Sequence, residues 1–415
     1  MRFWQIVLRS LRQHWLSTSL AMFSIALGVA LLAAVASLRE QSHRNFTEEG
    51  LGVDAVLGPK GSQLQIVLNA VYHLEEMPGK IKWTYYTKVL KDPIVESGIA
   101  FATGHSYAGF RVNAIEDSFF TDFEYVAGQH FSFRPEDGGQ GRVFQAREEA
   151  VAGWEAAKAL HLHLGQTFNP VCGINAGDPV HVNDDIKFVG IMAPTGTPHD
   201  RAIYIPLKTF YTLQGHDEVA KMADDEEFRE ISGAYLKIKR IRGGAMHPGI
   251  QELKYNIDQS SAAQLVIPNE VLPRLFTIIG WVDRVLVVIG ALVTLLAALF
   301  LVVALISALR ERRRDIALLR ALGAQRYTVF GLMLCESLAI TLLGGVLGIL
   351  AGHGLTAIGC HFIAAETGLR FSPWFVSVAD VWLLPGMAAL GVLAGIAPGI
   401  QAYRLGVLKN LTPIS

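Results

Sequence analysis

Residues 310–326 read Arg310-Glu-Arg-Arg-Arg-Asp-Ile-Ala-Leu-Leu-Arg-Ala-Leu-Gly-Ala-Gln-Arg326 and lie between two long apolar runs. Six of these seventeen residues are arginine, and Ile316, Leu318, Leu319 and Leu322 can share one face of a helix. Gly323 stands where a helix commonly ends. Such a segment can anchor the membrane topology, lie on anionic lipid, or dock into a soluble partner. Anchoring alone does not require an ordered apolar face that ends in glycine.

Four apolar runs are long enough to cross a membrane. The chain has 415 residues, of which 51% are hydrophobic and 18% charged. A span needs about 20 mostly apolar residues to cross a hydrocarbon core about 30 Å thick. The second run is the longest, and we expect it to project beyond the bilayer as a helix. The predicted spans are residues 16–38 (within a lead-in and first span at 1–38), 276–309, 327–355 and 381–403.

The placement of Lys and Arg predicts the topology. The N-terminal arm has three arginines, the 310–326 loop has six, and the 404–415 tail has Arg404 and Lys409, whereas the 356–380 loop has only Arg370. The two termini and the 310–326 loop are therefore expected in the cytoplasm, with residues 39–275 and the short 356–380 loop outside. The chain is thus predicted to be an α-helical membrane protein with four transmembrane helices and a large mixed α/β extracytoplasmic domain.

The charges are divided between the two parts of the chain. Residues 38–276 carry 23 Lys and Arg against 31 Asp and Glu, whereas the remainder carries 13 against 6. The basic excess therefore belongs to the membrane part, which argues against nucleic acid as a partner and favours membrane lipid.

The expected outer domain contains both strand and helix patterns. Residues 51–57, 186–192 and 234–239 are typical of strands, and residues 148–162 have the spacing of a helix. Residues 125–215 are predicted to form a subdomain inserted into a larger one.

Glycines mark helix packing in the later spans. Gly344, Gly348 and Gly352 form a doubled GxxxG pattern, which allows close approach of two helix backbones. Gly386, Gly391, Gly395 and Gly399, with Pro385 and Pro398, are expected to serve similar packing and bending roles in the fourth span. Glu336 in the third span is either a coupling carboxylate or, as we prefer, a structural group near the cytoplasmic interface. Asp283 and Arg284 lie near the outer end of the second span.

No catalytic motif is present in the sequence. It lacks a GxxxxGK[ST] phosphate loop, HExxH, GxSxG and a CxxC pair. His161 and His163 could hold a metal together with a carboxylate, and His105, His181 and His199 stand apart from one another. We interpret the histidines as scattered surface residues and predict no metal site. Cys172 is the only cysteine of the expected outer domain, so no disulfide framework can be derived.

Residues 312–326, followed by Phe330–Leu334, Glu336 and the Leu342–Gly348 segment, closely resemble the signature of FtsX-like and MacB-like ABC transporter permeases. The plan of one span, a large outer domain and three further spans is also similar to this family. The resemblance extends to residues 156–168 and to the tail segment 397–404.

This resemblance implies a mechanism of the mechanotransmission (type VII) class. The segment between the second and third spans would be the coupling helix, which seats in a groove of a separate cytoplasmic ABC ATPase. ATP and Mg²⁺ would be held by that ATPase, with no cofactor bound directly by the permease. The permease would form a homodimer, or a heterodimer with a paralogous permease, in the bacterial cytoplasmic (inner) membrane, and could engage a periplasmic adaptor. The residues assigned to coupling are Arg312, Arg313, Arg314, Asp315, Ile316, Leu318, Leu319, Arg320, Leu322 and Gly323.

Two functions agree with these features. In the first, the chain is the permease subunit of an ABC transporter that exports or extracts a substrate at the outer face. In the second, it is a non-transporting mechanotransmitter that regulates a periplasmic or cell-wall partner, as in the FtsX branch. An integral-membrane enzyme is less favoured, because no catalytic constellation is found.

Overall fold

A computed structural model describes most of the chain, and its contacts divide it into two compact units. The membrane unit comprises residues 1–42, 279–361 and 371–415, and the α/β domain comprises residues 43–278 and 362–370. The described residues are 15–47, 52–136, 139–173, 178–181, 184–213, 225–241, 244–311, 316, 320, 325–367 and 371–404.

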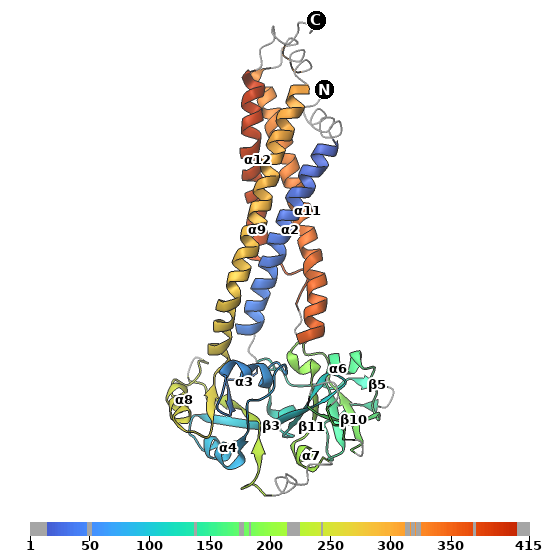
Figure 1. The fold of residues 1–415 in the computed structure, drawn as a ribbon, viewed down its shortest axis with the longest axis vertical. Helices are drawn as coiled ribbons and strands as arrows, with labels where there is room; N and C mark the ends of the chain where they lie inside the picture. The colour runs from blue at the N-terminus through green and yellow to red at the C-terminus, as the bar shows by residue number, and fades with distance from the viewer. Residues whose placement is uncertain are drawn as a thin grey trace. The chain divides into compact units, whose positions relative to one another are not determined.

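The membrane unit is a bundle of long apolar helices. Four helices of the described part are long and apolar enough to cross a membrane, which confirms the four predicted spans. Figure 1 shows them running alongside one another. The helices are α2 (Trp15–Thr47), α9 (Pro268–Glu311), α11 (Arg326–Thr367) and α12 (Val378–Arg404).

Two of these helices are much longer than a bilayer requires. α9 has 44 residues and α11 has 42, which correspond to about 66 Å and about 63 Å at a rise of 1.5 Å per residue. α11 continues to Thr367, through the first part of the segment predicted as the 356–380 outer loop. The segment 356–367 is mostly apolar and lacks proline, so nothing in it stops the helix.

The helix ends meet in two groups. Leu309 of α9, Val329 of α11 and Ala402 of α12 belong to one buried apolar cluster. In the other group, Glu40 and Gln41 of α2 accept hydrogen bonds from the backbone that leads into α12. The connection between α9 and α11 therefore shares one end of the bundle with the end of α12, as the topology prediction requires.

The α/β domain is built on one ten-stranded sheet with the order β14-β1-β13-β3-β4-β11-β7-β10-β8, and β9 pairs with β3. Most neighbours are antiparallel, but β11 runs parallel to β4 and β10 parallel to β7. The large strands are β1 (Ala55–Gly58), β3 (Val95–Tyr107), β4 (Phe110–Ile115), β7 (Glu149–Ala152), β10 (Ile186–Ile191), β11 (Ile203–Pro206), β13 (Gly233–Ile238) and β14 (Gln264–Val266). The short ones are β2 (Ile81–Lys82), β5 (Pro135–Glu136), β6 (Gly139–Gln140), β8 (Thr167–Phe168), β9 (Val171–Cys172) and β12 (Glu230–Ile231).

The sheet joins the two parts of the domain that the sequence separates. Pairing of β4 with β11 aligns Val112 with Ile203 and Ile115 with Pro206. Residues 125–215 thus supply one end of a sheet whose other end comes from the flanking segments. The idea that 125–215 behaves as a separate subdomain stays a prediction.

Helices cover this sheet locally. α3 contacts β1, α4 contacts β3, α7 contacts β4 and α8 contacts β14. A hydrogen bond from the backbone N–H of Gln65 to Ser62 Oγ caps α3, as is typical of helix starts. The helices are α3 (Gln63–Ala70), α4 (Trp83–Leu90), α5 (Phe119–Asp122), α6 (Trp154–Ala159), α7 (Leu207–Thr212), α8 (Ile250–Gln259) and the 3₁₀ turn η1 (Pro198–Arg201).

The strand patterns predicted at 186–192 and 234–239 are confirmed by β10 and β13. The helix predicted over residues 148–162 is confirmed only in part, because Trp154–Ala159 is helical but Glu149–Ala152 forms strand β7. The residues Ala150–Ala152 are fully buried, where β7 pairs with both β10 and β11. Tertiary pairing therefore overrides the helical tendency of an alanine-rich segment.

Candidate functional site

The predicted coupling segment is described at two positions, Ile316 and Arg320. Ile316 is only 4% exposed and packs in one apolar cluster with Leu309, Val329 and Met333. Arg320 is partly exposed. The other predicted coupling residues, Arg312, Arg313, Arg314, Asp315, Leu318, Leu319, Leu322 and Gly323, lie outside the described residues.

Ile316 ties this segment to the ends of three helices. Its cluster contains residues of α9, α11 and α12. Packed apolar clusters have low compressibility and transmit strain. A displacement of the segment around Ile316 would therefore reach all three helices directly.

The glycines of α11 form a seam against α2. A β-carbon built on Gly348 would lie 2.6 Å from Val29 Cβ and 2.7 Å from the carbonyl oxygen of Ala26. These spacings leave no room for a side chain at Gly348. Gly344 and Gly352 make equivalent contacts one helical turn to either side. The side chains opposite Gly344, Gly348 and Gly352 are, in order, Ile25, Val29 and Ala33.

Other small residues hold the remaining helices at similar distances. A side chain on Gly28 of α2 would collide with Thr294 of α9, and one on Gly391 of α12 would collide with Thr341 of α11. Gly399 lies against the ring of Phe330. The packing role predicted for Gly386 is wrong, because nothing lies within 4 Å of a β-carbon built there. The contact of Gly28 with α9 was not expected from the sequence, because a single glycine outside a GxxxG pattern carries no packing signal.

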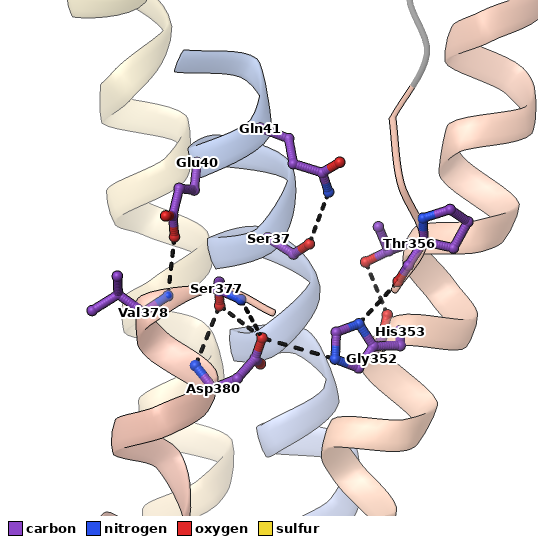
Figure 2. A network of polar contacts seen from close by, with 10 residues as sticks. Ser37, Glu40, Gln41, Gly352, His353, Thr356, Ser377, Val378 and Asp380 are labelled. Carbon is purple, nitrogen blue, oxygen red and sulfur yellow. Dashed lines mark hydrogen bonds and ion pairs between the residues drawn. The ribbon is translucent and has the colours of Figure 1, made fainter. Parts of the chain in front are cut away.

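A polar network connects α2, α11 and α12 at the end of the bundle opposite Ile316 (Figure 2). Asp380 Oδ2 accepts hydrogen bonds from the backbone N–H and the hydroxyl of Ser377, at 2.8 and 2.9 Å. Asp380 N–H donates to Ser377 Oγ at 3.2 Å. This reciprocal pair is a capping arrangement at the start of α12.

His353 of α11 completes the link. Its Nε2 lies 3.8 Å from Asp380 Oδ2, and its Nδ1 lies 3.0 Å from the carbonyl oxygen of Pro373. Both His353 and Asp380 are buried. The pattern Ser377-x-x-Asp380 is the signal in the sequence that could have revealed this cap.

α2 contributes the other half of the network. Glu40 Oε2 accepts from Val378 N–H at 3.0 Å, and Gln41 Oε1 accepts from Ser372 N–H at 2.7 Å. Gln41 also donates to Ser37 at 3.1 Å. These bonds fix the end of α2 to the loop before α12. Within the bundle, Glu336 is 3% exposed, in agreement with its predicted place in the third span.

The interpretation of the histidines as surface residues is wrong for five of those that the structure describes, one of which is His353 of α11. His73, His105, His181 and His199 are buried in the α/β domain, whereas His161 and His163 are exposed. Burial occurs because the partners of each ring come from distant strands, which spacing in the sequence does not show.

His73 and His199 belong to a buried hydrogen-bond chain. Asn113 Nδ2 lies 3.1 Å from His73 Nδ1, and Tyr204 Oη lies 2.7 Å from His199 Nδ1. His73 Nε2 lies 3.3 Å from His199 Nδ1. If Asn113 and Tyr204 donate, both rings accept at Nδ1 and are therefore neutral.

The electrostatics agree with neutral rings. Burial and then the Arg111 guanidinium lower the pKa of His73 to about 3. Burial and then the neighbouring His73 lower the pKa of His199 well below its usual value. This hydrogen-bond chain is a structural part of the domain interior. The rings of Phe119, Phe123 and Phe131 pack against its His199.

The second group consists of His105, Cys172 and His181. One ligand-type atom from each residue lies within 4.8 Å of the others. Their spacing in the sequence leaves His105 and His181 isolated and predicts no metal site, which differs from this arrangement.

Comparisons with known proteins cover nearly the whole chain. Residues 18–238 match the family model described as MacB-like periplasmic core domain, and residues 287–407 match FtsX-like permease C-terminal. The chain is 22% identical to the uncharacterized ABC transporter permease YvrN of Bacillus subtilis, over 97% of both chains. It is also 22% identical to the macrolide export ATP-binding/permease protein MacB of a Shewanella species, over 98% of this chain and 60% of that one.

Among solved structures, the periplasmic region of MacB from Actinobacillus actinomycetemcomitans matches 56% of this chain and 97% of that one, with 11% identity and a TM-score of 0.33.

Proposed function

This chain belongs to the family of ABC transporter permeases that combine a MacB-like periplasmic core domain with an FtsX-like C-terminal region, and from this we propose that it transmits the work of a cytoplasmic ATPase to its α/β domain. In this proposal the α/β domain lies outside the cytoplasmic membrane, and its movement exports or extracts a substrate at the outer face.

A separate ATPase subunit is part of the proposal. The Bacillus subtilis relative is matched over 97% of its length and is named a permease. The chain spans only 60% of the Shewanella MacB protein, whose name includes an ATP-binding part. Residues 1–415 contain no GxxxxGK[ST] phosphate loop, and in this proposal the ATP-binding function, with its Mg²⁺, is supplied by another chain.

The burial of Ile316 is the observation that carries the coupling step. A docking helix needs one side for the ATPase and another fixed to the membrane helices. Ile316 supplies the fixed side, because it packs with Leu309, Val329 and Met333. In this proposal the arginines that flank it in the sequence offer positive charge to the partner.

α9 supplies the path from this segment toward the α/β domain. It is one helix from Pro268 to Glu311. Its early residue Glu270 lies 3.4 Å from Lys254 of α8, and its late residue Leu309 packs with Ile316. A push at Ile316 would thus act on an element that also belongs to the α/β domain.

We also infer that two permeases assemble, as a homodimer or with a paralogous permease. Apolar side chains at helical spacing on α2, namely Leu16, Leu20, Phe23 and Leu27, are 54–67% exposed in the single chain. Lipid or a second permease would cover this stripe.

The first test is co-purification of the full chain with its ATPase from detergent. The double variant Arg313→Glu/Arg314→Glu, and separately Leu319→Asp, should lose the ATPase and its stimulation by the permease. Ile316→Ala serves as the comparison, because it removes a buried anchor and leaves the charges. It should lower the free energy of unfolding of the permease by about 2–5 kcal/mol, as is typical of a buried Ile→Ala change. The ATPase should still bind.

Full ATPase binding and stimulation in the charge-reversed and Leu319→Asp proteins would show that residues 312–322 only anchor the topology. A complex that binds and hydrolyses ATP but moves no substrate would instead favour the non-transporting regulator.

A further inference from the structure

A thiol and two imidazoles meet inside the α/β domain. His105 lies on β3, Cys172 on β9 and His181 just after the following turn. Their ligand-type atoms lie within 4.8 Å of one another. His105 is 2% and His181 8% exposed. Membership of the permease family does not account for this group.

The backbone places His105 and Cys172 side by side. They are directly opposite in the antiparallel pairing of β3 with β9, so their side chains share one face of the sheet. A register shift between Thr103 and His105 marks a bulge in β3. Its extra residue, Gly104 with φ of 147°, turns the strand so that His105 takes this position.

His181 is brought to the same point by antiparallel backbone pairing between residues 170–172 and 179–181. Cys172 N–H donates to the carbonyl oxygen of Pro179 at 2.8 Å, and His181 N–H donates to that of Pro170 at 2.9 Å. Ser106 Oγ donates to the carbonyl oxygen of Gly173 at 2.7 Å. These hydrogen bonds hold the backbone of all three residues in place.

We propose that His105, Cys172 and His181 bind a Zn²⁺ ion. One thiolate and two imidazoles form a donor set that Zn²⁺ prefers, with Zn–S near 2.3 Å and Zn–N near 2.0–2.1 Å. Tetrahedral ligands at those lengths lie about 3.3–3.7 Å apart. The three ligand atoms now lie within 4.8 Å of one another. Side-chain rotations that move each atom by about 1 Å would bring them to these distances.

Asp184 lies beside one of the ligands. Its Oδ2 lies 3.8 Å from His181 Nδ1, which is longer than a hydrogen bond. A shift of the carboxylate toward Nδ1 would let it hold the proton there and leave Nε2 for the metal, which is the usual arrangement around a ligating histidine. The rings of Phe210 and His105 pack edge to face, with centroids 5.0 Å apart, so one side of the site is apolar.

A pocket with an excess of acidic side chains lies beside Asp184. The carboxylates of Glu148, Asp184 and Asp185 line it together with Arg147, Thr209 and Thr212. Asp184 is thus shared between this pocket and His181. With three protein ligands, the fourth position of Zn²⁺ is left for water or a further ligand, which is the open coordination of non-structural zinc sites.

The buried pair His73 and His199 lacks the donor set of a zinc site. In the described part of the structure, their ring nitrogens contact each other, Asn113 and Tyr204, and no cysteine is among these partners. This pair therefore serves as an internal comparison for the metal titration of His105, Cys172 and His181.

The experiment uses the full-length protein in detergent, reduced and stripped of metal. Zn²⁺ is titrated against a chromophoric chelator, and Co²⁺ is used as a spectroscopic substitute. We expect one tight site per chain. Its Co²⁺ spectrum should show a thiolate-to-cobalt charge-transfer band and the intense visible bands of tetrahedral cobalt.

Cys172→Ser should remove the charge-transfer band, and His105→Ala or His181→Ala should weaken Zn²⁺ binding by about 100-fold or more. Asp184→Asn should weaken it by about 10–100-fold, as is typical of residues that orient a ligand, and it leaves the core packing in place if the ligand variants fail to fold. Cys335→Ser and His163→Ala are the matched controls and should bind as the unaltered chain does.

The proposal is overturned if the unaltered chain binds Zn²⁺ no more tightly than the Cys172→Ser protein does. It is also overturned if the thiolate band survives in Cys172→Ser and disappears in Cys335→Ser. Neither result depends on the ATPase, so the outcome is independent of the proposed coupling function.

Discussion

At the scale of single residues, His73 and His199 show how burial sets a protonation state. Both rings lie among aromatic side chains, and their partners are the neutral Asn113 and Tyr204. A protonated His73 could not accept the Asn113 hydrogen bond at Nδ1 and would face the Arg111 guanidinium. Neutral imidazole is therefore part of the folded structure.

The α/β domain should lose stability in acid because of these rings. The pKa of His73 is about 3 in the folded state, against about 6.5 in an unfolded chain. Above pH 6.5 both states are neutral. As the pH falls from 6.5 toward 3, only the unfolded chain binds the proton, so the free energy of unfolding falls by up to about 1.4 kcal/mol per pH unit.

His73→Asn should reduce that pH dependence. His73 has φ of 55°, a conformation that asparagine tolerates better than most residues. The urea midpoint of the domain, followed by pulse proteolysis at pH 7 and pH 5, should shift less in His73→Asn than in the unaltered chain. The exposed His163→Asn serves as the control. Equal shifts in all three proteins would mean that other groups dominate acid unfolding.

At the scale of elements, backbone approach determines how the membrane helices pack. Gly344, Gly348 and Gly352 of α11 lie against α2, and Gly391, Gly395 and Gly399 of α12 lie against α11. Side chains between lipid-embedded helices gain little from the hydrophobic effect, so close van der Waals packing supplies the attraction.

Gly348→Ala should separate α2 from α11. The new methyl group would lie 2.6 Å from Val29 Cβ and 2.7 Å from the Ala26 carbonyl oxygen, and overpacking of this kind costs about 1–3 kcal/mol. Gly354→Ala is the matched control on the same helix, since nothing lies within 4 Å of its β-carbon position. Melting in detergent should be lower for Gly348→Ala and unchanged or higher for Gly354→Ala. Equal melting temperatures would show that the seam does not bear on stability.

The sequence predicts elements better where the signal is local. Apolar length alone predicts the four spans, and the GxxxG spacing marks residues that the structure places against α2. Strand β7 was missed because its pairing with β10 and β11 overrides a local helix pattern. The group of His105, Cys172 and His181 was missed because a bulge and a β9 pairing assemble it, and neither leaves a motif in the sequence.

At the scale of the whole molecule, α9 is one of the described helices, with α2 and α11, whose residues fall in both units. Residues 268–278 are assigned to the α/β domain and the rest to the membrane unit. The proposed function requires α9 to remain stiff, because a flexible link would absorb the displacement that arises near Ile316.

Val288→Pro tests this requirement. Val288 is 55% exposed and lies in the interior of α9, so its side chain contributes little to packing. Proline there removes a helical hydrogen bond and kinks the helix, at a cost of about 3 kcal/mol, whereas Val288→Ala leaves the helix intact. With the ATPase bound in nanodiscs, ATP should change hydrogen exchange in the sheet for Val288→Ala but not for Val288→Pro. The same change in both proteins would exclude α9 as the transmitting element.

The seam between α2 and α11 has a repeat on both of its sides. Ile25, Val29 and Ala33 follow one another at intervals of four residues, as do the three glycines they face. Four residues of helix correspond to about 6 Å. A shift of α2 along its axis by that distance would place Ile25 opposite Gly348 and Val29 opposite Gly352. A shift by half that distance would instead press Val29 against the part of α11 between two glycines. The glycine spacing would therefore favour displacements of α2 along α11 in steps of about 6 Å over smaller ones.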